Sequence, residues 1–395
     1  MNFVLQPQTS RYFINPFLDD SNAVAKLVTE EWIKRQIGSL TEKITKRKIT
    51  SDEYKKDGPY VGPSGIAYAL SRVTKADIGH NFTKEINKIL EEATEQSSSN
   101  KCRYLNGRFG LYSIKYLLGV TNSASFSKKV NKLIDTILEE DFDNEMLNGR
   151  AGFLAAFLML RIEGAKEDTI SNDQVSQILN AMLEEGRSYS DENNSDANLM
   201  YEWHEKEYLG AAHGLAGILQ IFLSYWDFLD SKGKEDVKNT VDWFLTVQLE
   251  DGNFPSNLSK IGKEAKLVHW CHGATGALHM LLAAHLIFGE EKYLESAKSC
   301  ANIIWIKGIL SKGPGICHGV AGGGYSFLLL YRHTKEEEWL DKAKAFSFVM
   351  MSEIFEKKAR IPDRPFSLFE GWAGALCFLV DLLKPLKVQF PLIPI

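Results

Sequence analysis

The dipeptide Cys-His occurs twice in this sequence, as Cys271-His272 and as Cys317-His318, and each time a glycine follows it. Proteins bind zinc through cysteine sulfur and histidine nitrogen, and a catalytic zinc has three protein ligands and one open position. We therefore expect Cys271, Cys317 and His318 to bind zinc. The alternative is that these thiols are small buried side chains packed beside glycines, as free cysteines often are. The other three cysteines lack this setting and are expected to be core thiols.

The glycine after each Cys-His begins a Gly-x-x-Gly element, and this element recurs along the chain. One occurrence would carry no information, but seven occurrences at comparable intervals indicate an internal repeat. Each interval is long enough for two helices and their connections. The elements begin at Gly62, Gly107, Gly149, Gly214, Gly273, Gly319 and Gly371.

An almost continuously apolar segment follows each element, for example residues 274–288 and 372–383. A helix that is apolar all round is buried. Amphipathic segments such as residues 293–305 lie between them, and these predict helices with one solvated face. Seven buried and seven half-buried helices predict an all-α fold, an α/α toroid with an inner and an outer ring. An open solenoid is the alternative, but it would leave the inner helices partly exposed.

We expect the glycines to let the helix starts crowd together, because glycine has no Cβ. Helix starts carry partial positive charge, which suits thiolates, phosphates and carboxylates. The reaction centre is therefore expected where the Gly-x-x-Gly turns meet.

The repeats leave no room for a domain boundary, so we expect one domain over residues 1–395. The formal charge of -5 and the pI near 6.0 argue against nucleic-acid binding. No apolar run reaches the roughly 20 residues of a membrane span. Five cysteines and the absence of a secretory leader at Met1-Asn2-Phe3 favour reduced thiols and a cytoplasmic location.

Several motifs resemble the lanthionine synthetase C-like family, and the likeness extends over nearly the whole chain. They lie at residues 211–217, 269–273, 317–322 and 367–371, and residues 11–17 are similar to the opening of the eukaryotic members. The resemblance implies an α/α toroid with a zinc cofactor. For the eukaryotic, glutathione-associated branch it implies addition of glutathione to dehydroalanine or dehydrobutyrine residues of proteins or peptides.

The same resemblance suggests catalytic residues. His213 matches the histidine that bacterial cyclases use, and we expect it to donate the proton that completes the addition. Glu145 stands where those enzymes have an aspartate that works with the histidine. His272 occupies the place of a tyrosine beside the zinc cysteine, so it either orients the substrate, donates the proton, or supports the metal site. The chain departs from the bacterial pattern at Leu267, which replaces an arginine, and this argues against bacterial-style peptide cyclisation.

Glutathione contacts are implied in the same way. The family's lysine before the second zinc cysteine corresponds to Lys312, and its Arg-x-Pro-Asp stretch corresponds to Arg360, Ile361, Pro362 and Asp363. A lysine or arginine at such positions can pair with the carboxylates of the tripeptide.

Other enzymes with toroidal helices fit this sequence less well. Protein prenyltransferases and terpene cyclases are also built from toroidal helices, but their Asp-rich and Gln-Trp motifs do not occur in this sequence. A glycosidase would need a convincing pair of carboxylates. The second candidate is a non-catalytic zinc- and glutathione-binding signalling adaptor.

Overall fold

A computed structural model describes residues 3–54, 58–93, 101–139, 141–165 and 169–395. Within these ranges the regular elements are helices, and extended backbone is limited to isolated bridges, so the all-α prediction is confirmed. Met1 and Asn2, on which the expectation about a leader partly rests, lie outside the described residues.

Each Gly-x-x-Gly element begins a helix, as the repeat predicted. The first glycine is the residue immediately before the helix, and most side chains of the helix are buried because they are apolar all round. In α12 every residue from Ala274 to Ala284 is buried. These helices are α4 (Pro63–Lys75), α6 (Arg108–Leu117), α8 (Arg150–Ile162), α10 (Leu215–Ser224), α12 (Ala274–Phe288), α14 (Val320–Thr334) and α17 (Trp372–Leu382).

A half-buried helix precedes each of these in the chain. In α13, Tyr293, Ala297 and Cys300 are buried, whereas Glu295 is exposed, which matches the predicted amphipathic pattern. The half-buried helices are α2 (Glu30–Thr45), α5 (Thr83–Glu92), α7 (Ser123–Ile137), α9 (Asn172–Glu192), α11 (Ser231–Thr246), α13 (Glu291–Lys307) and α15 (Glu337–Met350). Short elements complete the described residues: α1 (Ser21–Ala25), α3 (Ser51–Tyr54), α16 (Glu353–Lys358), η1 (Trp226–Phe228), η2 (Leu258–Lys260) and η3 (Pro385–Lys387).

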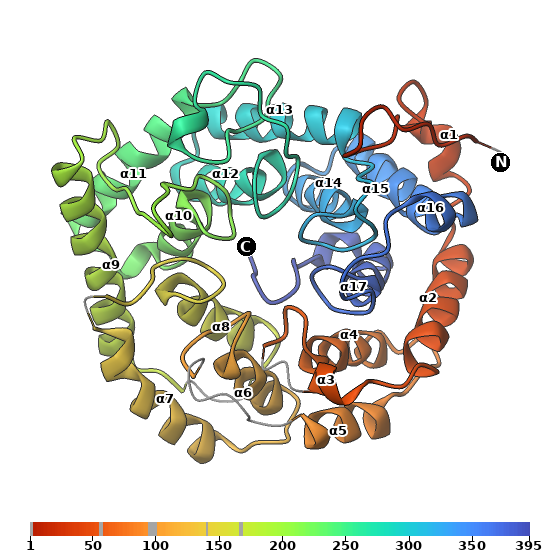
Figure 1. Cartoon of the computed structure of the whole chain (residues 1–395), viewed down its shortest axis with the longest axis horizontal. Helices are drawn as coiled ribbons and strands as arrows, with labels where there is room; N and C mark the ends of the chain where they lie inside the picture. Colours follow the sequence, from red (N-terminus) through yellow and green to blue (C-terminus); the bar gives the residue numbers. More distant parts are fainter. Residues whose placement is uncertain (1–2, 55–57, 94–100, 140, 166–168) are drawn as a thin grey trace. The chain divides into compact units, whose positions relative to one another are not determined.

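The chain divides into two compact units, and the first comprises residues 1–96, 268–270 and 301–391. In this unit the buried helix α17 contacts α4 and α14, and the half-buried helices pack outside them. Figure 1 shows α15 beside α14, and α2 and α5 beside α17 and α4. The unit thus has two helical layers.

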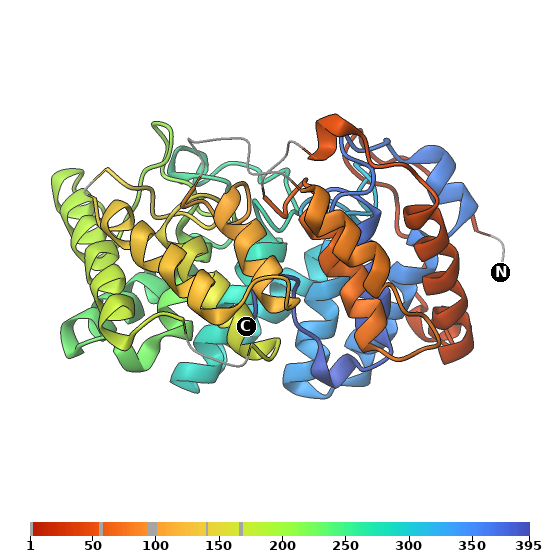
Figure 2. The same cartoon turned by 90° about the horizontal axis from the view of Figure 1, so that it is seen from below.

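The second unit comprises residues 97–267, 271–300 and 392–395. Its buried helix α10 contacts α8 and α12, and α8 contacts α6. The half-buried helices α7, α9 and α11 form the second layer, and Figure 2 shows α6 and α7 lying side by side. The same two-layer arrangement therefore recurs in both units. The organisation of residues 1–395 as one domain stays a prediction.

The glycines serve a purpose beyond the one expected from the sequence. In most elements the second glycine packs against a carbonyl of its own preceding connector, the segment that leads into the buried helix. Gly65 and Gly374 also approach a neighbouring connector, since a Cβ there would lie 2.8 Å from Leu368 and 2.9 Å from Ile316. A Cβ on Gly65 would lie 2.1 Å from the Pro59 oxygen, and one on Gly152 would lie 2.1 Å from the Met146 oxygen. No side chain fits there, so the motif is required for the turn that leads into the helix.

Backbone hydrogen bonds join neighbouring connectors within each unit. In the first unit the Trp270 amide donates to the Cys317 carbonyl at 2.8 Å, and the Cys317 amide donates to the Phe369 carbonyl at 2.9 Å. In the second unit the Met146 amide donates to the Ala212 carbonyl at 3.0 Å. Each connector is thereby held by the next, which fixes the residues just before the buried helices.

Candidate functional site

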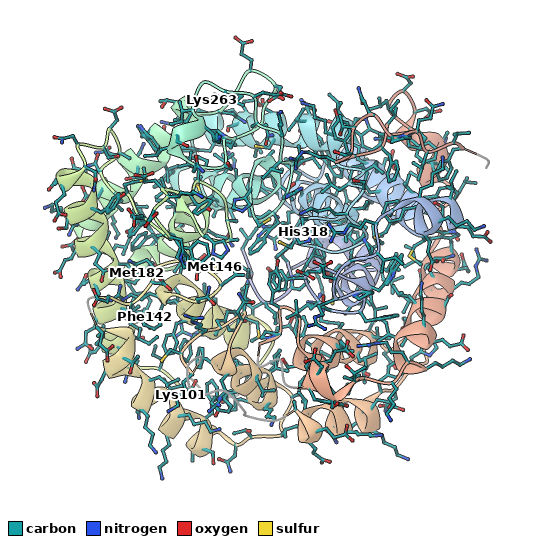
Figure 3. The ribbon with its side chains drawn as sticks, viewed as in Figure 1. Lys101, Phe142, Met146, Met182, Lys263 and His318 are labelled. Atoms are coloured by element: carbon teal, nitrogen blue, oxygen red, sulfur yellow. The ribbon has the colours of Figure 1, made fainter. Side chains whose placement is uncertain are left out.

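Cys317 and His318 lie at the amino-terminal end of α14, in the first unit (Figure 3). The Cys317 side chain is buried and its backbone is bonded on both sides, through its amide and its carbonyl. Burial disfavours a charged imidazole, but the hydrogen bond and the charge of Cys317 outweigh it and raise the pKa of His318. The sulfur and the imidazole nitrogen thus both attract a positive charge, as metal ligands do.

Cys271 directly follows Trp270 in the chain, and contacts within the second unit hold its backbone. Its carbonyl accepts a hydrogen bond from the Ala212 amide at 3.4 Å. A Cβ on Gly210 would lie 2.1 Å from the same carbonyl, so only glycine permits this approach. Gly273, with φ of +107°, then turns the chain into α12.

Cys317 and His318 belong to the first unit and provide a thiol and an imidazole that are adjacent in the sequence. Cys271, the third predicted ligand, belongs to the second unit and provides another thiol. Two sulfurs and one imidazole are a donor set that zinc prefers. By their chemistry, these residues therefore fit a zinc ion.

A pocket of about 460 Å³ lies in the first unit, and its charged lining residues are all cationic. Backbone bonds between three segments build it. The Ser311 amide donates to the Arg11 carbonyl at 2.9 Å, and the Arg360 amide donates to the Ser311 carbonyl at 2.7 Å. The lining residues are Ser10, Arg11, His269, Ser311, Lys312, Lys358, Ala359 and Arg360.

His269 forms part of this pocket although its side chain is only 4% exposed. Burial, together with the nearby charges of His318, Lys312 and Arg11, lowers the pKa of His269 to about 3. The imidazole is therefore neutral near pH 7. It supplies one donor and one acceptor among cations.

The residues predicted to contact glutathione divide between two places. Lys312 and Arg360 line the cationic pocket. Ile361 and Pro362 line an adjacent apolar hollow of about 280 Å³, and the Ile361 residue is 75% exposed. Asp363 forms an ion pair with Arg360 at 2.8 Å. Arg360 lines both places, so the cationic pocket holds two of the five residues and the apolar hollow holds three.

His213 and Glu145 form a hydrogen-bonded pair in the second unit. The His213 Nδ1 atom lies 2.8 Å from Oε2 of Glu145, and the Glu145 residue is 2% exposed. The Glu145 carboxylate also accepts backbone N–H bonds from Leu147 and Asn148. A carboxylate held in this way orients the imidazole and leaves its Nε2 available for proton transfer.

Arg150, at the start of α8, holds the connector that carries Glu145. Its guanidinium is fully buried and donates to the carbonyls of Ile137 and Phe142, at 2.8 Å each, and to the Asn144 side chain at 2.9 Å. Phe142 and Met146 mark this connector in Figure 3. Arg150 thus holds the backbone of the connector, and the Glu145 carboxylate is held in addition by its own hydrogen bonds.

His272 lies near His213, with ring centroids 6.5 Å apart, and near Tyr208 at 5.4 Å. The indole of Trp203 stacks on the His213 ring with centroids 3.7 Å apart and planes 3° apart. Sequence reasoning missed Trp203 and Tyr208, although two aromatic residues in a strongly charged loop are an unusual feature. Both lie outside any periodic segment.

Sequence reasoning also missed Arg11 and Lys358 as pocket residues. Arg11 opens the segment that resembles the eukaryotic members, which was a usable signal. Lys358 carries no such signal, because it is one of two adjacent lysines at the end of α16. The remaining cysteines, Cys102, Cys300 and Cys377, are buried core thiols as expected.

Among the described residues, the helices are too short or too polar to cross a membrane.

Comparisons with known proteins agree with these features. The family model described as "Lanthionine synthetase C-like protein" matches residues 54–395. A Danio rerio protein named Glutathione S-transferase LANCL1 is 38% identical over 252 residues, which is 63% of this chain and 61% of that relative. The chain therefore aligns with about three fifths of the relative's length.

Among solved structures, a nisin cyclase matches with a TM-score of 0.65 and 16% identity, over 90% of this chain and 94% of the other. At this identity the likeness speaks for the fold alone. It confirms the predicted α/α-toroid fold class.

Proposed function

Because the chain belongs to the lanthionine synthetase C-like family, we propose that it is a zinc-dependent transferase of glutathione. In this proposal it adds the glutathione thiol to dehydroalanine or dehydrobutyrine residues of proteins or peptides. The Danio rerio relative, whose name is that of a glutathione S-transferase, supports the thiol substrate. The proposed location is cytoplasmic, which is supported by five cysteines that are all reduced thiols.

The observation that carries the proposal is the cationic pocket. Glutathione has two carboxylates and one ammonium group, and Arg11, Lys312, Lys358 and Arg360 offer several partners for the carboxylates. The neutral His269 adds a hydrogen-bonding group that can accept from the ammonium or from a peptide N–H. The same unit contains Cys317 and His318, so the pocket and these two zinc ligands belong to one packed body.

Cys271, Cys317 and His318 would hold the zinc. When bound, the metal supplies an open position at which a thiol is deprotonated near neutral pH. The pocket cations would orient the tripeptide so that its sulfur is presented for attack. These cations are exposed, so water and salt screen part of their attraction to the carboxylates.

The addition needs a proton at the carbon that the thiol does not attack. The glutathione sulfur forms a bond to Cβ of the dehydro residue, and the π electrons move onto the neighbouring carbonyl as an enolate. His213 then gives the proton on Nε2 to Cα, and the product is a thioether. Glu145 stabilises the protonated imidazole before transfer and keeps Nδ1 occupied. His213 regains a proton from the solvent, which also takes up the thiol proton.

His272 is the alternative proton donor. It is half-buried, and its ring lies near both Tyr208 and His213. The bonded carboxylate favours His213, because the buried Glu145 orients this ring and stabilises its positive charge. A substitution at each position distinguishes the two, since only loss of the true donor abolishes protonation of Cα.

The proposal is tested with a dehydroalanine-containing peptide, glutathione and the purified protein, followed by intact-mass measurement. The expected result is a peptide heavier by one glutathione, formed faster with wild type than with Cys317→Ala. Cys102→Ala is the matched control, because Cys102 is a core thiol outside the zinc trio. If the peptide stays unmodified while glutathione still binds, the non-catalytic adaptor is the better account.

A further inference from the structure

Trp203 contacts His213 face to face. The two rings are almost parallel, with planes 3° apart, and their centroids are 3.7 Å apart, which is full van der Waals contact. The edge of the His204 ring packs against the indole at a centroid distance of 4.1 Å. The indole therefore contacts both a neighbour in sequence and the imidazole of the proposed proton donor.

The turn that presents Trp203 is strained. His204 has φ of 48° and Glu205 has φ of 58°, which is the left-handed region that side chains other than glycine and asparagine seldom adopt. The Trp203 amide donates to the Lys206 carbonyl at 2.9 Å and closes the turn. Two consecutive residues in this region persist only where the surroundings impose them.

The segment after the turn is anchored to another loop of the same unit. The Leu258 amide donates to the Glu207 carbonyl at 3.0 Å, and the Leu209 amide donates to the Ser256 carbonyl at 3.1 Å. These two bonds flank Tyr208. The anchored segment leads into residues 209–213, so one short stretch of chain delivers both members of the stack.

The hydrogen bond to Glu145 alone does not fix the imidazole, because the ring can swing about the Nδ1 contact. A stacked indole blocks that rotation. Its face also attracts the positive imidazolium more than the neutral ring. The other groups facing His213 are Tyr208 and His272, which lie farther away and are tilted to its ring.

We propose that Trp203 is a positioning residue that locks the His213 ring so that Nε2 points at the reacting carbon. This inference rests on the proposed role of His213 as the acid of the glutathione addition. Trp203 itself touches neither substrate nor metal in this account. The strained turn of residues 203–206 is the device that holds the indole in place.

The kinetic test compares Trp203→Ala with Trp203→Phe. The alanine variant should lose about 10- to 100-fold in kcat, the scale expected when a reacting group is misplaced, with little change in the KM for glutathione. The phenylalanine variant, which can still stack, should regain most of the rate. Trp243→Ala is the matched control, since it removes a half-buried indole of α11 that lies outside the turn.

Zinc content and thermal unfolding of each variant show whether the protein remains intact. An alanine variant with full kcat would overturn the inference and leave the proposed function untouched. A phenylalanine variant as slow as the alanine variant, at unchanged stability, would also overturn it. Equal loss in kcat and in glutathione affinity would point to collapse of the site and would count against positioning.

A second measurement needs no substrate. A protonated imidazole quenches the fluorescence of an indole stacked on it, so the wild-type emission should fall as His213 takes up its proton. The chain has eight tryptophans, and the signal of Trp203 is obtained as the difference between wild type and Trp203→Phe. The change should vanish in His213→Asn and persist in Trp243→Phe.

If the wild-type fluorescence does not depend on His213, the proposed stacking of Trp203 on His213 is wrong, whether or not the protein adds glutathione. Failure of wild type to add glutathione would instead overturn the proposed function, and with it the catalytic purpose of Trp203. In that case the quenching would still be seen, so the two failures can be told apart.

Discussion

Nδ1 of His213 lies 2.8 Å from the buried carboxylate of Glu145, although the two residues are 68 positions apart in the chain. The pair belongs to the connectors that precede α8 and α10, and the hydrogen bond from Met146 to Ala212 joins these connectors directly beside it. The backbone hydrogen bond between the two connectors therefore sets the distance between Glu145 and His213. The hydrogen bond between their side chains completes the pair.

The first prediction concerns this pair. His213→Asn should retain zinc and glutathione binding but lose roughly 100-fold or more in the addition rate, which is the scale of general acid catalysis. Glu145→Gln should lose less, because the amide can still orient the ring but cannot stabilise its charge. Rates and elemental analysis of both variants provide the check. Zinc lost from His213→Asn would instead make His213 a ligand.

The second prediction concerns the metal. Purified wild type should contain one zinc per chain, and Cys317→Ala should lose most of it, because removal of one of three ligands leaves an incomplete site. Cys300→Ala serves as the control, since Cys300 is a fully buried thiol on α13. Elemental analysis after purification without chelators decides the question, and metal-free wild type would contradict the assignment.

The third prediction concerns the cationic pocket. A desolvated charge-assisted hydrogen bond contributes about 1.5 to 3 kcal/mol. The side chains of Lys312 and Arg360 are exposed, however, and Arg360 already pairs with Asp363. We therefore expect Lys312→Ala or Arg360→Ala to weaken glutathione binding by about 3- to 10-fold, which is less than a desolvated contact would give. Added salt should also weaken glutathione binding to the wild type, because it screens exposed charges.

Lys358 and its neighbour allow a matched comparison in the same calorimetric titrations. Lys358 lines the pocket, whereas Lys357 pairs with Glu353 on the surface of α16. Lys358→Ala should weaken binding and Lys357→Ala should not. Equal affinity in all these variants would remove the pocket as the glutathione site.

The fourth prediction concerns the glycines. Gly65→Ala should destabilise the fold by about 3 kcal/mol, because its Cβ would lie 2.1 Å from the Pro59 carbonyl and 2.8 Å from Leu368 Cβ. Gly38→Ala in α2 should stabilise it by about 0.5 to 1 kcal/mol, since the new Cβ would meet its nearest atom at an ordinary 3.6 Å. Urea unfolding of both variants measures the difference.

The sequence by itself determined the helices, and it predicts the zinc trio. Seven glycine elements in phase with apolar segments predict buried helices because burial depends on side-chain periodicity, which is a local property. Cys271, Cys317 and His318 are expected to bind zinc because equivalent places in a repeat fold alike, and this assignment stays a prediction. The contact of a glycine with the carbonyl of its own connector was not predicted, since it depends on the path of the turn.

Only the tertiary structure decided what surrounds those residues. Arg11 and Lys358 line one pocket with Lys312 because backbone bonds align segments hundreds of residues apart. The stack of Trp203 on His213 depends on a strained turn and on its anchoring to residues 256–258. Contacts between loops leave no periodic pattern in the sequence, because they depend on the distances at which the packed helices hold the connectors.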